Sequence, residues 1–137
     1  MMPESAKIRS HRDLKVWQRA LSLVDHVYSL TASFPEREKY GLASQMRRAA
    51  VSVPSNTAEG KSRQYRTEYR QFLYHALGSL AELDTQRTIA FRQGYLSSSS
   101  NEALEGEMLQ LRNMIMTLAL RLRSVTKSKA LNPKPET

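Results

Sequence analysis

The sequence of 137 residues lacks cysteine, which excludes a disulfide framework and a thiolate metal site. It also lacks any stretch near the roughly 20 apolar residues that a membrane-spanning helix needs. No apolar run of the kind found in secretory signals follows Met1. Glycine and proline are scarce, with five of each, and no segment shows the alternation of a β-strand. We therefore expect a helical, cytoplasmic protein without a membrane partner.

Groups that could carry catalysis are also few. The histidines His11, His26 and His75 are not spaced with a second histidine or a carboxylate as in zinc-binding helices. The chain has no glycine-rich phosphate loop and no nucleophile elbow. The expected core faces offer almost none of the inward glutamates of a di-iron bundle. The sequence thus predicts no enzyme, no metal ion and no other cofactor.

What the chain does have is positive charge. Lys and Arg total 21 against 13 Asp and Glu, which gives a formal net charge of +8. Such an excess favours polyanionic partners, with nucleic acid ahead of anionic membrane surfaces. The alternative is that the charge only keeps the protein soluble.

Apolar residues at helical spacing predict four long helices. The first should span residues 13–32 and end before Phe34-Pro35, because the residue before proline leaves the α region. One of its two apolar rows is taken as the core face: Trp17, Leu21, Val24 and Tyr28, with Leu14 and Ala20 beside them. The second row makes the apolar face wider than one bundle contact requires: Val16, Leu23, Val27 and Leu30.

The second helix should span residues 40–62, where Pro54 should kink the helix or split it and Gly60 should weaken its end. Its core face consists of Leu42, Met46, Ala49, Ala50, Val53 and Thr57. The third should span residues 67–93 and stop at Gly94. Its core face consists of Tyr69, Phe72, Leu73, Ala76, Leu80, Leu83, Ala90 and Phe91.

Arg87 falls at the centre of the third apolar face and needs a partner, with Gln86, Glu82 or a carboxylate from another helix as candidates. After a polar loop over residues 97–100, Asn101 should cap a fourth helix that runs to about Val125. Its heptad consists of Leu104, Met108, Leu111, Ile115, Leu118, Leu122 and Val125.

Four long helices with short links predict an all-α fold, an antiparallel up-down-up-down four-helix bundle with its second helix kinked at Pro54. The bundle should occupy residues 13–126. An N-terminal extension over residues 1–12 should precede it. A basic tail over residues 127–137 should follow and be disordered.

Basic residues gather on and after the second helix, and we predict that they contact nucleic-acid phosphates: Arg47, Arg48, Lys61, Arg63, Arg66 and Arg70. Arg63, Arg66 and Arg70 would share a face if the helix were continuous there. Tyr65 and Tyr69 lie among them, and a tyrosine could stack on an unpaired base, although Tyr69 also fits the core. Plain surface charge is the alternative.

The third and fourth helices carry further apolar or small residues away from the core: Tyr74, Gly78, Ala81, Thr85, Ile89, Leu109, Met116 and Leu120. A lone bundle needs one apolar stripe per helix, so these residues favour contacts between subunits of a homo-oligomer. The alternative is an ordinary scatter of apolar surface residues.

Four segments of the sequence resemble the 23S rRNA intervening-sequence proteins, over residues 13 to about 96. They are Asp13 to Trp17, Phe34-Pro35 with Tyr40 to Leu42, Arg47 to Gly60, and Gly78 to Leu83 with Thr85-Gln86. The family usually has isoleucine where Val53 and Thr57 stand, so Thr57 places a hydroxyl on the core face.

The resemblance implies a left-handed up-down bundle that assembles as a ring, a pentamer in characterised relatives. Distant relatives are accessory proteins of retroelements, where a basic pentamer associates with a reverse transcriptase and nucleic acid. Polar positions of the family pattern are matched by Arg47, Arg48, Asn56, Glu59 and Glu82. The sequence therefore predicts a non-enzymatic, ring-forming accessory protein that binds RNA or DNA. The alternative is an adaptor that binds another protein through its outer helix faces.

Overall fold

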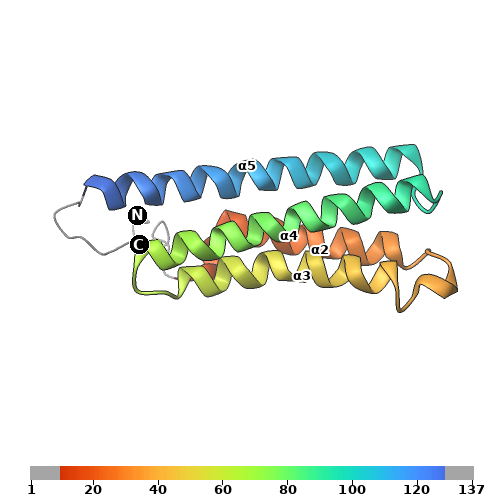
Figure 1. The fold of residues 1–137 in the computed structure, drawn as a ribbon, viewed down its shortest axis with the longest axis horizontal. Helices are drawn as coiled ribbons and strands as arrows, with labels where there is room; N and C mark the ends of the chain where they lie inside the picture. Colours follow the sequence, from red (N-terminus) through yellow and green to blue (C-terminus); the bar gives the residue numbers. More distant parts are fainter. Residues whose placement is uncertain (1–9, 129–137) are drawn as a thin grey trace, which may run out of the picture.

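The computed structural model describes residues 10–128, and in it four long helices form an antiparallel bundle (Figure 1). The helices are α2 (Lys15–Thr31), α3 (Leu42–Lys61), α4 (Arg66–Arg92) and α5 (Ser98–Ser128). Two short 3-10 helices accompany them, η1 (His11–Asp13) before α2 and η2 (Glu36–Glu38) between α2 and α3. No strand occurs among these residues.

Each helix packs against its neighbour in the chain, and α2 also packs against α5. Within residues 10–128 no contacts join the diagonal pairs α2–α4 and α3–α5. The helices therefore occupy the four corners of an up-down-up-down bundle, and the predicted fold is confirmed. The predicted tail and N-terminal extension lie mostly outside the described residues.

The buried face of α2 differs from the predicted one. The buried residues are Val16, Ala20, Leu23, Val27 and Thr31. Of the row taken as the core, Leu21 is 38% and Tyr28 45% exposed, and Val24 is only partly buried against the core, whereas the flanking Leu14 and Ala20 are buried. That prediction was wrong because the two rows are about equally apolar. The inner row carries the smaller Ala20 and Thr31, which lets the neighbouring helices approach closely.

Helix α3 runs through Pro54 as one element, so it is not split there, and its kink stays a prediction. The predicted core residues Met46, Ala49, Ala50, Val53 and Thr57 are buried, whereas Leu42 is only partly buried. The buried hydroxyl of Thr57 donates to the carbonyl oxygen of Pro54 at 2.9 Å and is thereby satisfied.

Gly60 marks the closest approach of α3 to α4. A Cβ atom added at Gly60 would lie 2.9 Å from Cβ of Phe72 and 3.0 Å from Cδ1 of Tyr69. The glycine is therefore required by packing, and α3 ends one residue after it, at Lys61; a weakening of the helix end by Gly60 stays a prediction.

Helix α4 ends as predicted at Gly94, which has a φ of 81°. The N–H of Gly94 donates to the Phe91 carbonyl at 3.0 Å, and that of Tyr95 donates to the Ala90 carbonyl at 2.9 Å. This pair of bonds is the Schellman motif, which satisfies the last carbonyls of a helix. Phe91 itself is 39% exposed, so its assignment to the core was wrong.

Helix α5 begins earlier than predicted, because the hydroxyl of Ser97 accepts a bond from the Ser100 N–H at 3.1 Å and caps the helix. The predicted loop over residues 97–100 is therefore the first turn of α5. The first four heptad residues are buried, but Ala119 replaces Leu118 as the buried position further on. A straight α-helix drifts relative to a strict seven-residue repeat, which explains this change.

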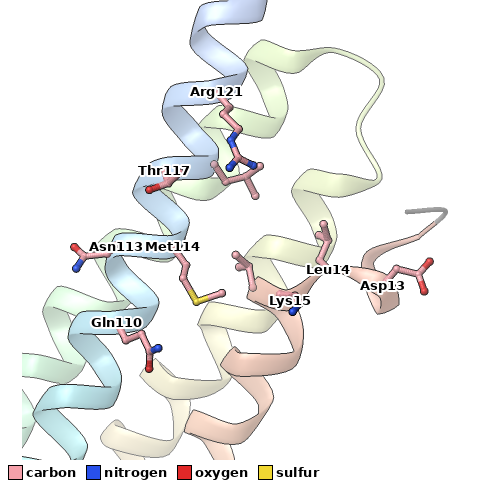
Figure 2. A pocket seen from close by; sticks show the side chains of 10 residues that line it. Asp13, Leu14, Lys15, Gln110, Asn113, Met114, Thr117 and Arg121 are labelled. Carbon is pink, nitrogen blue, oxygen red and sulfur yellow. The ribbon is translucent and has the colours of Figure 1, made fainter. Parts of the chain in front are cut away.

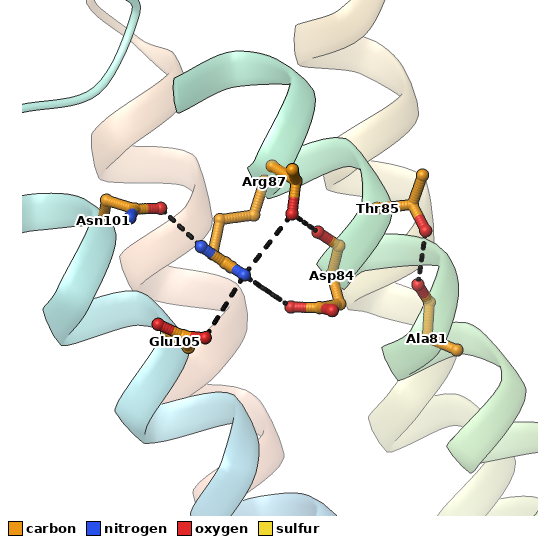
Figure 3. A network of polar contacts seen from close by, with 7 residues as sticks. Ala81, Asp84, Thr85, Arg87, Asn101 and Glu105 are labelled. Atoms are coloured by element: carbon orange, nitrogen blue, oxygen red, sulfur yellow. Dashed lines mark hydrogen bonds and ion pairs between the residues drawn. The ribbon is translucent and has the colours of Figure 1, made fainter. Parts of the chain in front are cut away.

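Arg87 is only 6% exposed and joins α4 to α5 through polar contacts (Figure 3). Its Nη2 donates to Oδ1 of Asp84 at 2.8 Å, and its Nη1 donates to Oδ1 of Asn101 at 2.5 Å. Glu105 of α5 lies 3.6 Å from Nη2. The prediction that this arginine needs a partner is confirmed, although Gln86 and Glu82 are not the partners. Asn101 binds Arg87 and does not cap the helix.

The bundle is least closed between α2 and α5. His26 Nδ1 and Glu107 Oε1 lie 2.6 Å apart and connect the two helices near their middle. Towards the start of α2 an opening remains, across which Met114 of α5 reaches toward α2 (Figure 2). No helix in the described range is long and apolar enough to cross a membrane.

Candidate nucleic-acid interface

The six predicted phosphate-binding residues fall into two groups at opposite ends of the bundle. Arg47 and Arg48 lie in the second turn of α3, near the connection from α2. The others lie around the connection from α3 to α4: Lys61, Arg63, Arg66 and Arg70. Fourteen helical residues separate Arg47 from Lys61, which corresponds to roughly 20 Å. Figure 1 shows the two connections at opposite ends, so the six residues do not form one patch.

We call the second group, residues Lys61, Arg63, Arg66 and Arg70, the turn cluster. Helix α3 ends before Arg63 and α4 begins at Arg66, so Arg63 does not continue the face of the other two arginines. Its Nη2 lies 2.6 Å from Oε2 of Glu59, and its guanidinium carbon lies 4.8 Å from the ring centroid of Phe72. The arginine at the centre of the turn cluster is thus already engaged within the chain.

The two tyrosines of the turn differ in exposure. Tyr65 is 49% exposed. Tyr69 packs against the core, and this burial raises the pKa of its phenol. Only Tyr65 therefore offers a ring to a partner, and Tyr69 belongs to the core, as the competing interpretation of the sequence allowed.

At the other end, α2 and α3 form a groove that combines cations with aromatic rings. It has a volume of about 550 Å³ and is lined by Tyr28, Lys39, Tyr40, Ser44, Arg47, Arg48, Val51 and Ser52. We call it the tyrosine–arginine groove. Three lining residues are cationic and none is acidic. Sequence reasoning identified Arg47 and Arg48 but missed the other contributors. Tyr28 in particular was assigned to the core of the bundle.

Cation and ring lie close together in two places of this groove. The guanidinium carbon of Arg47 lies 4.6 Å from the ring centroid of Tyr28, and Nζ of Lys39 lies 5.6 Å from that of Tyr40. Nε of Arg47 donates to the hydroxyl of Thr31 at 2.8 Å, which fixes the side chain. Arg48 is exposed. In the described part of the chain, no carboxylate forms an ion pair with Lys39, Arg47 or Arg48.

Glu38 fixes the backbone next to the groove without lining it. Its carboxylate accepts bonds from the Leu42 N–H at 3.0 Å and from the Tyr95 hydroxyl at 2.9 Å. These hydrogen bonds, the backbone one first, lower the pKa of Glu38 from its ordinary value of 4.5. The carboxylate adjacent to Lys39 in sequence is therefore engaged by Leu42 and Tyr95 and forms no ion pair with the cations of the groove among the described residues.

The polar residues of the family pattern have structural partners for the most part. Asn56 Nδ2 donates to the Ser52 carbonyl at 2.8 Å, and the Ser52 and Ser79 hydroxyls lie 2.7 Å apart between α3 and α4. Glu59 pairs with Arg63, as described above, and Glu82 is exposed on α4. Asn56 Nδ2 also donates to the Ser52 hydroxyl at 3.0 Å and so helps to orient the hydroxyl that contacts α4.

The residues predicted at a subunit interface lie on the outer faces of α4 and α5. All are exposed except Met116, which is partly buried. Leu109 is 55% exposed and Leu120 is 49% exposed. A Cβ atom added at Gly78 would have no neighbour within 4 Å, so this face of α4 is open in the single chain.

The residues that the structure describes include no group of three or more histidines, aspartates and glutamates that could hold a metal ion.

Comparison with known proteins adds a family and a fold. The family model described as 23S rRNA-intervening sequence protein matches residues 12–117. A crystal structure of a protein with unknown function from the S23 ribosomal protein family of Bacteroides thetaiotaomicron VPI-5482 is similar, with a TM-score of 0.69 and 17% sequence identity. The similarity covers 76% of this chain and 97% of that one, and at this identity it concerns the fold alone. No curated protein matches the sequence.

Proposed function

Since the chain belongs to the family of 23S rRNA-intervening sequence proteins, we propose that it is a non-enzymatic, self-assembling protein that binds RNA or DNA as an accessory factor. The observation that carries this proposal is the tyrosine–arginine groove, where three cations and two tyrosine rings line a surface without a carboxylate. Such a surface suits a polyanion, because arginine and lysine contact phosphate oxygens and release the counterions of the nucleic acid.

The groove supplies the principal phosphate contacts, through Arg47, Arg48 and Lys39. The turn cluster supplies weaker contacts, because Arg63 at its centre is already held by an exposed ion pair with Glu59. Contacts of this kind hold the backbone and carry little sequence information, so binding depends strongly on salt and weakly on sequence.

Binding of a fluorescently labelled RNA at several salt concentrations tests the proposal. The double variant Lys39→Glu/Arg48→Glu reverses two exposed charges of the groove and leaves the bond from Arg47 to Thr31 intact. We expect its affinity to fall roughly tenfold or more and its salt dependence to weaken by about two ion equivalents. The turn variant Arg63→Glu/Arg66→Glu should lose less.

The matched control is Arg19→Glu/Arg92→Glu, which changes the net charge equally at exposed positions outside both groups. Equal losses in the groove variant and in this control would remove the groove as the binding site. Undetectable binding by the unaltered protein at low salt would contradict nucleic-acid binding altogether. Recovery of one protein partner after nuclease treatment would then favour the adaptor function.

Self-assembly is the second part of the proposal, with five copies as the resemblance implies. The open face around Gly78 and the exposed leucines of α5 support it, because contiguous exposed apolar surface marks contact sites. Light scattering should give a mass several times the 15.7 kDa of one chain. Gly78→Leu should lower that mass, whereas Gly106→Leu, at an equally open glycine of α5, should not. A strict monomer at micromolar concentration would contradict this part.

A further inference from the structure

The least explained side chain in the described structure is Tyr40. It is 87% exposed, which makes it the most exposed of the large hydrophobic residues whose side chains the structure describes, residues 10–123. A tyrosine ring in water contributes nothing to a core. The one cation–π contact of this ring among the described residues is with the ammonium group of Lys39, 5.6 Å from the ring centroid. A ring left open in this way is suited to contact with something outside the chain.

The backbone that carries Tyr40 is fixed. The N–H of Gly41 donates to the Glu38 carbonyl at 3.0 Å, and the Glu38 carboxylate binds the Leu42 N–H on the other side of Tyr40. A Cβ atom added at Gly41 would lie 2.9 Å from Oε1 of Glu38, so the glycine allows the carboxylate to fold over the turn. The exposed ring therefore stands on an ordered turn, and binding to it costs little conformational entropy.

Cations are arranged beside this ring. Nε of Arg47 is occupied by Thr31, but its two terminal nitrogens make no hydrogen bond within the described residues. The exposed side chain of Arg48 follows it on α3, Lys39 directly precedes Tyr40 in the chain, and all three cations line the groove with Tyr40. The second tyrosine, Tyr28, stacks more closely with Arg47 and is 45% exposed, which leaves Tyr40, with Lys39 at 5.6 Å, as the more open ring.

We propose that the tyrosine–arginine groove binds an unpaired nucleobase stacked on Tyr40, with the neighbouring phosphates held by Arg47, Arg48 and Lys39. This inference rests on the proposed function and names the ligand of the same site. In a duplex both faces of each base are covered by its neighbours, so the ring has nothing to stack on. An unpaired base offers a free face, and every base can stack, so the preference is for single strands and not for a sequence.

The turn cluster differs from the groove at one arginine, while its other cations, Lys61, Arg66 and Arg70, also form no ion pair among the described residues. Its exposed tyrosine, Tyr65, has Arg63 nearby, but that arginine pairs with Glu59 and stacks on Phe72. The turn should thus attract phosphates of single strands and duplexes alike. Tyr65 is therefore a matched control for Tyr40, since both are exposed tyrosines next to basic residues.

The test measures dissociation constants of the full chain for three fluorescein-labelled probes of equal length: an oligouridylate, an oligothymidylate and an RNA duplex. Tyr40→Ala should weaken binding of the single strands at least about fivefold, the lower end for one stacked base, and leave duplex binding unchanged. Tyr40→Phe should restore single-strand binding, because stacking needs only the ring. Tyr65→Ala should change neither. Circular dichroism confirms that each variant is folded.

If Tyr40→Ala weakens binding of both single strands, the groove recognises the base and phosphate that RNA and DNA share. If it weakens binding of the oligouridylate alone, RNA is the ligand. An unchanged ratio of single-strand to duplex affinity in Tyr40→Ala overturns the inference while leaving the proposed function standing. Failure of the unaltered protein to bind any probe overturns both.

Discussion

The two ends of the bundle contain similar numbers of cations but present them differently. At the α3–α4 end, Arg63 is paired with Glu59 and rests on Phe72, while Lys61, Arg66 and Arg70 form no ion pair among the described residues. At the α2–α3 end, the cations of the tyrosine–arginine groove are free of ion pairs among the described residues, and the nearest acid in sequence, Glu38, is bound elsewhere. The comparison teaches that the charge available to a partner depends on where the neighbouring carboxylates point, and not on the count of cations alone.

The two ends are also held together differently. The α3–α4 end depends on close packing, because Gly60 lies directly against Phe72 and Tyr69. The α2–α3 end, together with the adjacent α4–α5 connection, depends on hydrogen bonds made by Glu38 and Arg87. The polar end therefore keeps an exposed tyrosine on a fixed backbone, next to the buried side chains of Phe34 and Leu96.

The largest expected effect on stability is at the polar end. Arg87→Ala removes charge-assisted hydrogen bonds to Asp84 and Asn101 and the packing of a buried stem, so we expect a loss of about 2–3 kcal/mol in the free energy of unfolding. Urea denaturation measures it, with Arg92→Ala as an exposed control on the same helix. Equal stability of the two variants would show that the contacts of Arg87 do not hold this end.

A smaller effect is expected at the packed end. Gly60→Ala gains helix propensity but forces Cβ against Phe72 and the backbone of Tyr69, so the net result should be a destabilisation of about 1–2 kcal/mol. In Gly106→Ala the new Cβ meets nothing within 4 Å, so this control should stabilise α5 by up to about 1 kcal/mol. If both substitutions stabilise the protein, Gly60 is not the close contact described.

The smallest effect concerns pH and the carboxylate of Glu38. Its pKa is lowered in the folded state, so it stabilises the fold above the ordinary value of 4.5, and this contribution is lost as the pH falls through the lower, folded-state value. Glu38→Gln should therefore lower stability at neutral pH and flatten the acid side of the stability curve. Thermal denaturation of both proteins between pH 7 and about pH 3 measures this difference over the range in which the Glu38 carboxylate becomes protonated.

The matched control for Glu38 is Glu36→Gln in the same 3-10 helix, since the Glu36 side chain makes no hydrogen bond in the part of the chain described. It should leave the acid side of the curve as in the unaltered protein. Identical curves for the Glu38 and Glu36 variants would contradict the role of Glu38 in fixing the turn.

Helix spacing was enough to predict the four helices, the stop at Gly94 and the need of Arg87 for a partner. It was not enough to orient α2, because its two apolar rows are about equally hydrophobic and only the packing distance to neighbouring helices selects the row with Ala20. This error hid Tyr28. The groove brings Tyr28 of α2 next to Arg47 of α3, a contact between helices that no spacing along one helix contains.

The role of Tyr40 was missed for a related reason. In the sequence it reads as the start of a helix, and only its 87% exposure and the bonds of Glu38 around it show an ordered ring outside the core. Gly60 likewise reads as a weak helix end until the distance to α4 is known. Properties that depend on the separation of two helices are thus the ones that the sequence pattern leaves undetermined.

The most direct test of where nucleic acid binds is photo-crosslinking of a single-stranded oligonucleotide that contains 4-thiouridine, followed by mass spectrometry of the tryptic peptides. Residues 40–47, which carry Tyr40, form one tryptic peptide, and residues 64–66, which carry Tyr65, form another. We predict crosslinks in the peptide of residues 40–47, suppressed by unlabelled single strand. Crosslinks confined to residues 64–66 would contradict the assignment of binding to the tyrosine–arginine groove.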